Sequence, residues 1–355
     1  MRECPEVLKL ITGKKITTKE EWEIFRRPEI KVLFENFMYG KLPEESRIPV
    51  SYTDWGETRD EKGRRMQTVT VNTLKTAFRF FVYLPEYATH RQKVPAILYL
   101  MFGWDKENEV PIDKILKRGY AVCCFPVAGA AADSQSSKIT GVYQDAPKET
   151  PHSWGAISVW AWAAGKVMDY LQTMKQLQVD KIGIAGHSRG GKTALWAFAN
   201  DTRFAICLAL NSGCGGASLS RGKNEENETI ASITQHIGYW FADCLKEYAG
   251  KEELLPVDQH MLLALAAPRP IYVTSATQDY WSDPDGELES CLKAGSVYQL
   301  YGMDGLVMEE ALQPDISYQK GQIAYHRRTG AHGYTWSDWE HFFDFADRVL
   351  AIKKE

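Results

Sequence analysis

The segment Gly-His-Ser-Arg-Gly at residues 186–190 contains a serine that could act as a nucleophile. It follows an apolar segment, residues 181–185, and precedes a helix-forming segment, residues 192–199. A serine on a tight turn between a strand and a helix needs small residues two positions before and after it, and its hydroxyl is then exposed above a sheet. Because both flanking segments are present, the sequence predicts that Ser188 is a catalytic nucleophile rather than an ordinary turn residue.

A serine hydroxyl requires a base to take its proton and a carboxylate to orient that base. Where the serine follows a strand in this way, the acid and then the histidine come later in the chain. His332 lies between the last predicted strand and the last predicted helix, so we expect it to be the base. Asp279 follows the predicted strand 270–276 and is the expected acid. Asp283 is the alternative, although it precedes a proline and a helix, where a capping role would explain it.

The oxyanion of a tetrahedral intermediate needs hydrogen-bond donors aimed at it. We expect one donor from the backbone N–H of Arg189 and another from Gly103, in the turn Phe102-Gly103-Trp104 after an earlier strand. The guanidinium of Arg189 could stabilise the same charge, or it could belong to an ordinary surface arginine.

Composition excludes several classes of function. With 44% hydrophobic and 25% charged residues the chain is globular, and its net charge of −4 gives no reason to expect nucleic acid or a membrane as partner. There is no H-E-x-x-H motif, and the seven cysteines are odd in number and lack C-x-x-C spacing. We therefore expect no metal and no cofactor, and mostly buried thiols. Met1 is followed by no apolar run of signal-peptide length, which predicts a cytoplasmic chain, or a secreted one if a leader has been removed.

The elements that must position these residues can be expected from the apolar pattern. Residues 1–48 are charged and helix-prone and should form an accessory segment, with a capping threonine at residues 17–18. Alternating patterns predict antiparallel strands, and later uninterrupted apolar runs predict strands covered on both faces. The antiparallel strands are at 50–54, 66–72 and 77–84, and the later strands are at 96–101, 120–125, 181–185, 204–210, 270–275 and 323–326.

Helices are expected at 156–174, after Ser188, at 285–293 and at 336–350, and the intervals 212–268 and 296–322 should be loops or caps near the site. The chain is thus expected to be one domain over residues 1–355. Its expected fold is an α/β-hydrolase fold, a three-layer α/β/α sandwich with a doubly wound, mostly parallel sheet.

Several ordered motifs resemble carbohydrate esterase family 15, the glucuronoyl esterases, in its bacterial branch. They extend from the N-terminal region to the loop that contains His332, so the resemblance covers nearly the whole chain. The motifs are residues 22–43, 186–192, 211–217, 255–260, 266–270, 279–284 and 330–332.

The resemblance implies an esterase that cleaves the bond between a glucuronic acid carboxyl, as in the 4-O-methyl-glucuronoyl branches of xylan, and an alcohol. It also implies that Arg189 contributes to the oxyanion site and that Lys192 and Trp281 hold sugar hydroxyls. Glu228 and Gln235 would complete the sugar pocket. An esterase of the same fold acting on acetylated xylan, and a non-catalytic carbohydrate-binding relative, are the two alternatives.

Two positions depart from the pattern of the family. Many members have a glutamate as the triad acid where this chain has Asn211, and an amide cannot stabilise an imidazolium. This departure is a further reason to expect the acid at Asp279. Fungal members have a disulfide that joins a cysteine before the serine to one after the histidine, and His187 and Gly333 occupy those positions here.

Overall fold

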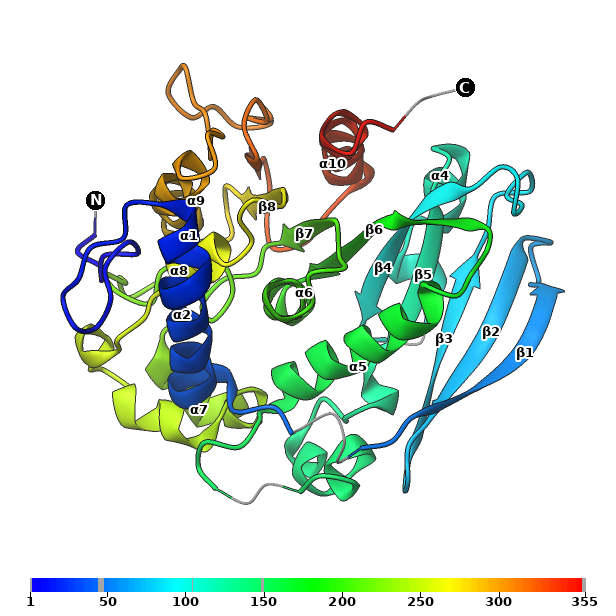
Figure 1. Ribbon diagram of the computed structural model, residues 1–355, viewed down its shortest axis with the longest axis horizontal. Coiled ribbons are helices and arrows are strands. Elements are labelled where there is room, and N and C mark those ends of the chain that lie inside the picture. Colours follow the sequence, from blue (N-terminus) through cyan, green and yellow to red (C-terminus); the bar gives the residue numbers. More distant parts are fainter. Residues whose placement is uncertain (1, 44–47, 104, 148–149, 353–355) are drawn as a thin grey trace.

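The computed structural model describes residues 2–43, 48–103, 105–147 and 150–352 (Figure 1). In these residues nine strands form one sheet, in the order β1-β2-β3-β5-β4-β6-β7-β8-β9. The strands are β1 (Ser51–Arg59), β2 (Arg65–Asn72), β3 (Ala77–Tyr83), β4 (Val94–Met101), β5 (Ala121–Pro126), β6 (Leu177–His187), β7 (Ile206–Leu210), β8 (Ile271–Ala276) and β9 (Ile323–Arg328).

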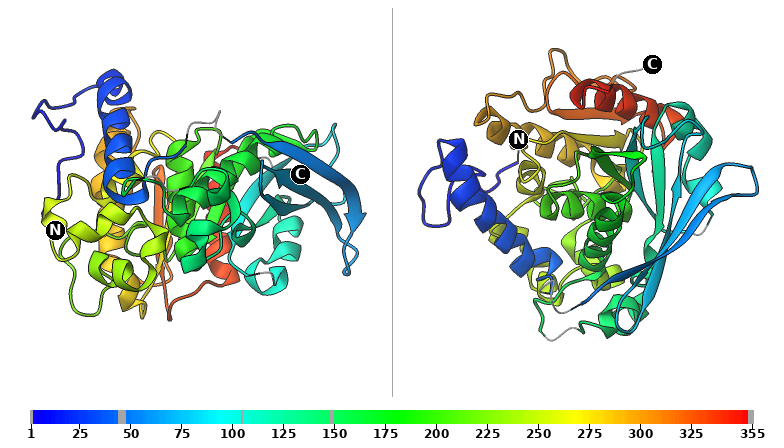
Figure 2. Two further views of the ribbon diagram at one scale, coloured as in Figure 1. Left: turned by 90° about the horizontal axis from the view of Figure 1, so that it is seen from below. Right: turned by 45° about the vertical axis from the view of Figure 1, so that its right-hand side comes forward.

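The sheet has an antiparallel part and a parallel part. β1, β2, β3 and β5 pair antiparallel in that order, whereas β5, β4, β6, β7, β8 and β9 pair parallel to one another. Strands β1 and β2 form one end of the molecule, and the N-terminal helices lie at the opposite end (Figure 2). The carboxyl ends of β6, β8 and β9 meet at one edge of the parallel part, and parallel sheets of this kind hold their functional groups at that edge.

Helices cover both faces of the sheet. The larger helices are α2 (Arg27–Phe34), α4 (Ile112–Lys117), α5 (Ala156–Leu171), α6 (Arg189–Asn200), α7 (Ile230–Ile237), α8 (Gln259–Ala264), α9 (Pro284–Gln299) and α10 (Trp336–Val349). Shorter turns include α1 (Lys19–Glu21), α3 (Lys106–Glu109), the π-helical turns η1 (Trp22–Arg26) and η2 (Glu35–Tyr39), and the 3₁₀ turns η4 (Val127–Gly129), η5 (Gln135–Ile139), η6 (Gly141–Gln144), η7 (Gly238–Trp240), η8 (Asp243–Tyr248), η9 (Glu252–Leu254) and η10 (Tyr280–Ser282).

The side chains of β4 show why the sheet must be covered twice. All eight residues of β4 are buried. Tyr99 and its alternating neighbours pack with α4 and α10 on one face, whereas Leu98 and Leu100 pack with α5 and α6 on the other. Successive side chains of a strand point to opposite faces, so an uninterrupted apolar strand requires helices on both sides. This confirms the predicted doubly wound sheet and the α/β/α sandwich.

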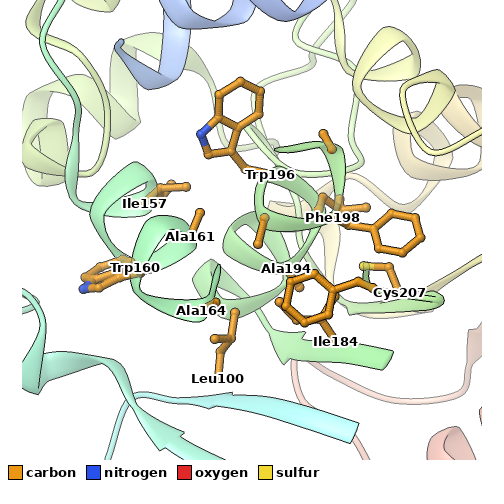
Figure 3. Close-up of a cluster of buried hydrophobic side chains, with 14 of the residues drawn as sticks. Leu100, Ile157, Trp160, Ala161, Ala164, Ile184, Ala194, Trp196, Phe198 and Cys207 are labelled. Atoms are coloured by element: carbon orange, nitrogen blue, oxygen red, sulfur yellow. The ribbon is translucent and has the colours of Figure 1, made fainter. Parts of the chain in front are cut away.

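A dense apolar cluster fixes α6, the helix that begins directly after Ser188. Side chains from α5, α6 and three strands interlock there (Figure 3). The indole N–H of Trp196 donates to Ser158 Oγ at 2.9 Å, so the polar atom of this buried ring is satisfied. Because α6 cannot shift against α5 and the sheet, its first turn is a rigid support for the serine.

The N-terminal segment forms a continuous helical run over residues 19–39. Thr18 caps it, since its side chain accepts from the backbone N–H of Glu21 at 3.2 Å, as the sequence predicts. Trp22 and Phe34 are fully buried against the main core. The interval 212–268, expected to be loops or caps, contains the helices α7 and α8. Among the described residues, no helix is both long and apolar enough to span a membrane.

Candidate active site

Ser188 lies between the end of β6 and the start of α6, with φ 55° and ψ −122°. Its backbone N–H donates to the carbonyl of Leu210 at 2.8 Å, which joins the turn to β7. A Cβ on Gly186 would lie 2.3 Å from the carbonyl oxygen of Gly190, so this crossing requires glycine. A left-handed φ at a residue other than glycine is strained, and such strain is typical of active sites. The structure thus has the predicted elbow.

His332 and Asp279 form a close pair at the carboxyl ends of β9 and β8. His332 Nδ1 lies 2.7 Å from Asp279 Oδ2, and the imidazole is 42% exposed whereas the aspartate is buried. Asn211 Nδ2 donates to the same oxygen at 3.0 Å. Burial raises the pKa of Asp279, but hydrogen bonds from His332, Ser282 and Asn211 outweigh it and leave that pKa below its ordinary value. The carboxylate is therefore ionised at neutral pH and holds the proton of His332 on Nδ1, which leaves Nε2 for a substrate or nucleophile.

Asp283, the alternative acid, has other partners. It caps α9 by accepting the Gly286 N–H at 3.0 Å, and it pairs with Arg2 at 2.6 Å and Lys223 at 2.7 Å. Burial raises the pKa of Asp283, but hydrogen bonds and the charges of Arg2 and Lys223 hold it well below its usual range. The structure therefore joins His332 to Asp279 and assigns Asp283 to the support of α9.

The residue before the nucleophile also touches the histidine. The ring of His187 lies 4.6 Å from that of His332 and 4.9 Å from that of Tyr334, between centroids. Burial, with a smaller contribution from His332, lowers the pKa of His187 to about 3. His187 is therefore neutral at physiological pH, and it limits the rotation of His332 by packing.

The two predicted oxyanion donors have different surroundings. The guanidinium of Arg189 lies over the ring of Phe102, 4.6 Å from its centroid, and its Nε is 2.7 Å from Asp133 Oδ2. The amides of Phe102 and Gly103 both donate to the carboxylate of Glu109, Phe102 at 2.9 Å. The Gly103 N–H expected to face an oxyanion thus already has an acceptor. Trp104, the third residue of this turn, lies outside the described residues.

Three of the four predicted sugar-binding residues lie together. Lys192, one turn after Ser188 on α6, donates through Nζ to the carbonyl of Ser212 at 2.8 Å and to Glu228 Oε2 at 3.1 Å. The backbone N–H of Glu228 donates to the carbonyl of Trp281 at 2.8 Å, and 52% of Trp281 is exposed. Gln235 lies on the exposed side of α7 and has no hydrogen bond to these residues in the described part of the chain.

Sequence reasoning missed four residues around this site. Asp133 pairs with Arg189, Ser282 Oγ lies 3.4 Å from His332 Nδ1, and Trp240 lies 5.8 Å below the ammonium of Lys192. Glu287 is fully buried and accepts from the Gly213 N–H and from two serines, and burial raises its pKa to about 7. Asp133, Trp240 and Glu287 lie outside the motifs, whereas Ser282 lies within the motif 279–284 but was given no role there.

In the part of the chain that the structure describes, no group of three or more histidine, cysteine, aspartate or glutamate side chains could hold a metal ion. All seven cysteines are free, and six of them are buried, as the sequence predicts. The disulfide of fungal family members has no counterpart at His187 and Gly333.

A doubly wound sheet with a serine on an elbow, and a histidine and a carboxylate after the last two strands, defines a serine hydrolase of the α/β-hydrolase class. A family model described as fungal glucuronyl esterase matches residues 68–302. Carbohydrate esterase MZ0003, from an unknown prokaryotic organism, is 34% identical over 391 residues, covering 98% of this chain and 89% of the relative. The chain belongs to the glucuronoyl esterases, carbohydrate esterase family 15, as its motifs indicate.

Other relatives and solved structures agree with this assignment. The 4-O-methyl-glucuronoyl methylesterase of Schizophyllum commune is 27% identical, over 84% of this chain and 74% of that protein. A glucuronoyl esterase from Solibacter usitatus superposes with a TM-score of 0.88 at 30% identity and covers 98% of both chains. A promiscuous esterase of the same family, from a marine bacterial metagenome, superposes with a TM-score of 0.87 at 32% identity, over 98% of this chain and 97% of that one. The protein is therefore a carboxylic ester hydrolase that is similar to the bacterial members of the family.

Proposed function

We propose that this protein hydrolyses esters of a glucuronic acid carboxyl, such as those of the 4-O-methyl-glucuronoyl branches of xylan. One observation carries the proposal. Lys192 lies one helical turn after Ser188, and its backbone N–H donates to the carbonyl of Ser188 at 3.1 Å. Its ammonium is buried and paired with Glu228. A sugar ring whose own carboxyl is attacked by Ser188 must lie within reach of such groups. Ammonium and carboxylate together can donate to and accept from several hydroxyls.

The proposed reaction begins when Ser188 Oγ attacks the ester carbonyl and His332 Nε2 takes its proton. Asp279 stabilises the imidazolium that forms. The backbone N–H and the guanidinium of Arg189 stabilise the oxyanion. The C–O bond to the alcohol then breaks, and His332 gives the proton to the leaving oxygen. Water, deprotonated by His332, attacks the acyl-enzyme. The bond to Ser188 Oγ then breaks, His332 returns the proton to this oxygen, and the uronic acid is released and ionises.

Trp281 and Glu228 are proposed to complete the sugar site. An exposed indole offers an apolar face to a sugar ring and an N–H to one hydroxyl. Lys192 and Glu228 are buried, so their positions are set before substrate arrives. The relatives described as 4-O-methyl-glucuronoyl methylesterases, and the family itself, support this choice of acyl group.

An activity panel tests the proposal directly. We expect turnover of methyl glucuronate and benzyl glucuronate, with little hydrolysis of an acetylated xylooligosaccharide. Ser188→Ala should abolish the activity without loss of folding, which assigns the turnover to this site. Hydrolysis of acetyl esters with no activity on uronate esters would replace the proposal by the acetyl esterase alternative. Binding of xylan without turnover of any ester would favour the non-catalytic one.

A further inference from the structure

Asp133 lies outside the proposed triad and outside the proposed sugar site, yet it forms an ion pair with Arg189, the proposed oxyanion donor. Its Oδ2 lies 2.7 Å from Arg189 Nε. Its Oδ1 accepts from the hydroxyl of Tyr239 at 2.9 Å and from the indole N–H of Trp240 at 2.8 Å. One carboxylate, from the segment after η4, thus uses both oxygens to contact three side chains, two from η7 and one from the start of α6.

The groups that hold Asp133 are themselves fixed. A Cβ on Gly155, at the start of α5, would lie 2.3 Å from the carbonyl oxygen of Trp240, so this turn is in close contact with the helix. Tyr239 and Trp240 are both buried. Their two donors set the position and rotation of the carboxylate, and its charge holds the guanidinium of Arg189 by an ion pair, in which Nε is not aligned as a hydrogen-bond donor.

Two aromatic rings also pack against the guanidinium of Arg189. The guanidinium lies 4.6 Å from the ring centroid of Phe102 and 5.8 Å from that of Trp240. Phe102 packs edge-on against Trp160, a buried residue of α5, at 4.9 Å. The side chain of Arg189 is nevertheless 36% exposed, so without the ion pair it would have room to sample other rotamers in solvent.

We infer that Asp133 is a positioning residue, which holds the guanidinium of Arg189 where the oxyanion forms. The inference rests on the proposed function of Arg189 as an oxyanion donor. A donor contributes to catalysis when its position is set before the reaction, because no reorganisation is then needed as charge develops. The ion pair orders a long flexible side chain in the free enzyme, so this cost is absent from the chemical step.

The charge of Asp133 has a second consequence. The ester substrate is neutral at its carboxyl, but the product is a carboxylate anion. Arg189 paired with Asp133 attracts that anion less than an unpaired arginine would. Removal of Asp133 should therefore slow the chemical step and strengthen product binding, a combination that a residue needed only for folding would not produce.

The first test is a double-mutant cycle with Asp133→Asn and Arg189→Ala, measured on methyl glucuronate. We expect each single variant to lower kcat by about 10- to 100-fold with little change in KM. The double variant should be no slower than Arg189→Ala alone, because Asp133 acts through Arg189. Inhibition of Asp133→Asn by free glucuronate should appear at several-fold lower concentration than in the wild type.

A matched control comes from another ion pair. Asp169 Oδ1 lies 2.7 Å from Arg203 Nη1, the same separation as between Asp133 and Arg189. Asp169→Asn should leave both kcat and product inhibition unchanged. Tyr239→Phe removes a single donor to Asp133 with little change in volume. It should lower kcat a few-fold in the wild type and not at all in Arg189→Ala, and it decides the question if Asp133→Asn does not fold.

The outcomes separate the inference from the function on which it rests. Wild-type kcat in Arg189→Ala would contradict the oxyanion role of Arg189 itself, and the inference would be overturned with it. A loss in Arg189→Ala with none in Asp133→Asn would overturn the inference alone. So would a further loss in the double variant, because Asp133 would then act on something other than Arg189.

Discussion

Asp279→Asn should remove the negative charge beside His332 and keep the hydrogen bonds. His332 Nδ1 and Asn211 Nδ2 both point at Asp279 Oδ2, at 2.7 and 3.0 Å. A carboxamide oxygen in that position accepts from both donors, whereas a carboxamide nitrogen there would face two N–H groups. The variant therefore keeps the His332 tautomer with its proton on Nδ1 and loses only the charge that stabilises the imidazolium.

The size of the loss follows from the charge alone. Opposite unit charges about 4 Å apart near a protein surface attract by about 4 kcal/mol. The imidazole of His332 is 42% exposed, so solvent screening reduces this to roughly 2–3 kcal/mol. The expected fall in kcat is thus about 100-fold. It is well below the roughly 10⁴-fold loss expected where the same substitution also forces the wrong tautomer.

A swapped pair of substitutions sharpens the test. In Asp279→Asn combined with Asn211→Asp, residue 211 no longer donates, and its carboxylate faces the amide of residue 279. The carboxylate favours the amide nitrogen in that position, and the same nitrogen then faces His332 Nδ1. The swap should therefore be slower than Asp279→Asn alone, with a loss that approaches the roughly 10⁴-fold expected for the wrong tautomer. The assay is steady-state hydrolysis of benzyl glucuronate at pH 7, with folding of each variant checked by circular dichroism.

Asp283→Asn is the matched control. It should lower the free energy of unfolding, because Lys223 is left buried without its carboxylate, yet change kcat by less than about threefold. Loss of kcat in Asp283→Asn with none in Asp279→Asn would refute the assignment of the acid. A loss of 10⁴-fold or more in Asp279→Asn would refute the argument from Asn211, since the amide nitrogen would then face His332.

Two further predictions concern buried charges. Lys192→Met should lower kcat/KM on methyl glucuronate by about 100-fold, because it removes a proposed sugar donor and leaves Glu228 unpaired. The same variant should change the hydrolysis of 4-nitrophenyl acetate by less than about threefold. Equal losses on the two substrates would contradict the sugar-binding role. Burial raises the pKa of Glu287 to about 7, against about 4.3 in the unfolded chain. Between these two pKa values the folded chain binds more protons than the unfolded chain, so the free energy of unfolding falls as the pH rises. Glu287→Gln should flatten that decline in urea unfolding at pH 5 and pH 8, and an unchanged decline would contradict this reading.

The elements that carry the site were predictable because their signals are local. An uninterrupted apolar strand such as β4 can only be covered on both faces, and the pattern around Ser188 contains both the strand and the helix of the elbow. Asp283 was predicted to be a helix cap as well as an alternative acid, from its place before a proline. The structure shows the cap, with the N–H of Gly286 donating to it at 3.0 Å.

What the sequence does not reveal depends on contacts between distant loops. Nothing in the pattern shows that the carboxylate of Glu109 turns back onto the amides of Phe102 and Gly103. Asp133 and Trp240 are more than 100 residues apart, and both lie in segments without periodicity. Their hydrogen bonds follow from how η7 packs on α5, and that packing is a property of the whole core.

The charges next to Ser188 form separate pairs, and this explains how one site can bind a uronate ester and release a uronate. Arg189 is paired with Asp133, and Lys192 is paired with Glu228. In the proposed function, a neutral ester is therefore held by hydrogen bonds to these groups rather than by a net positive field. Hydrolysis converts it to an anion, which meets two cations whose charge is already balanced, and the attraction that would retain the product is weak. Substrate selection at such a site depends on the positions of hydroxyl groups, since charge distinguishes only the product.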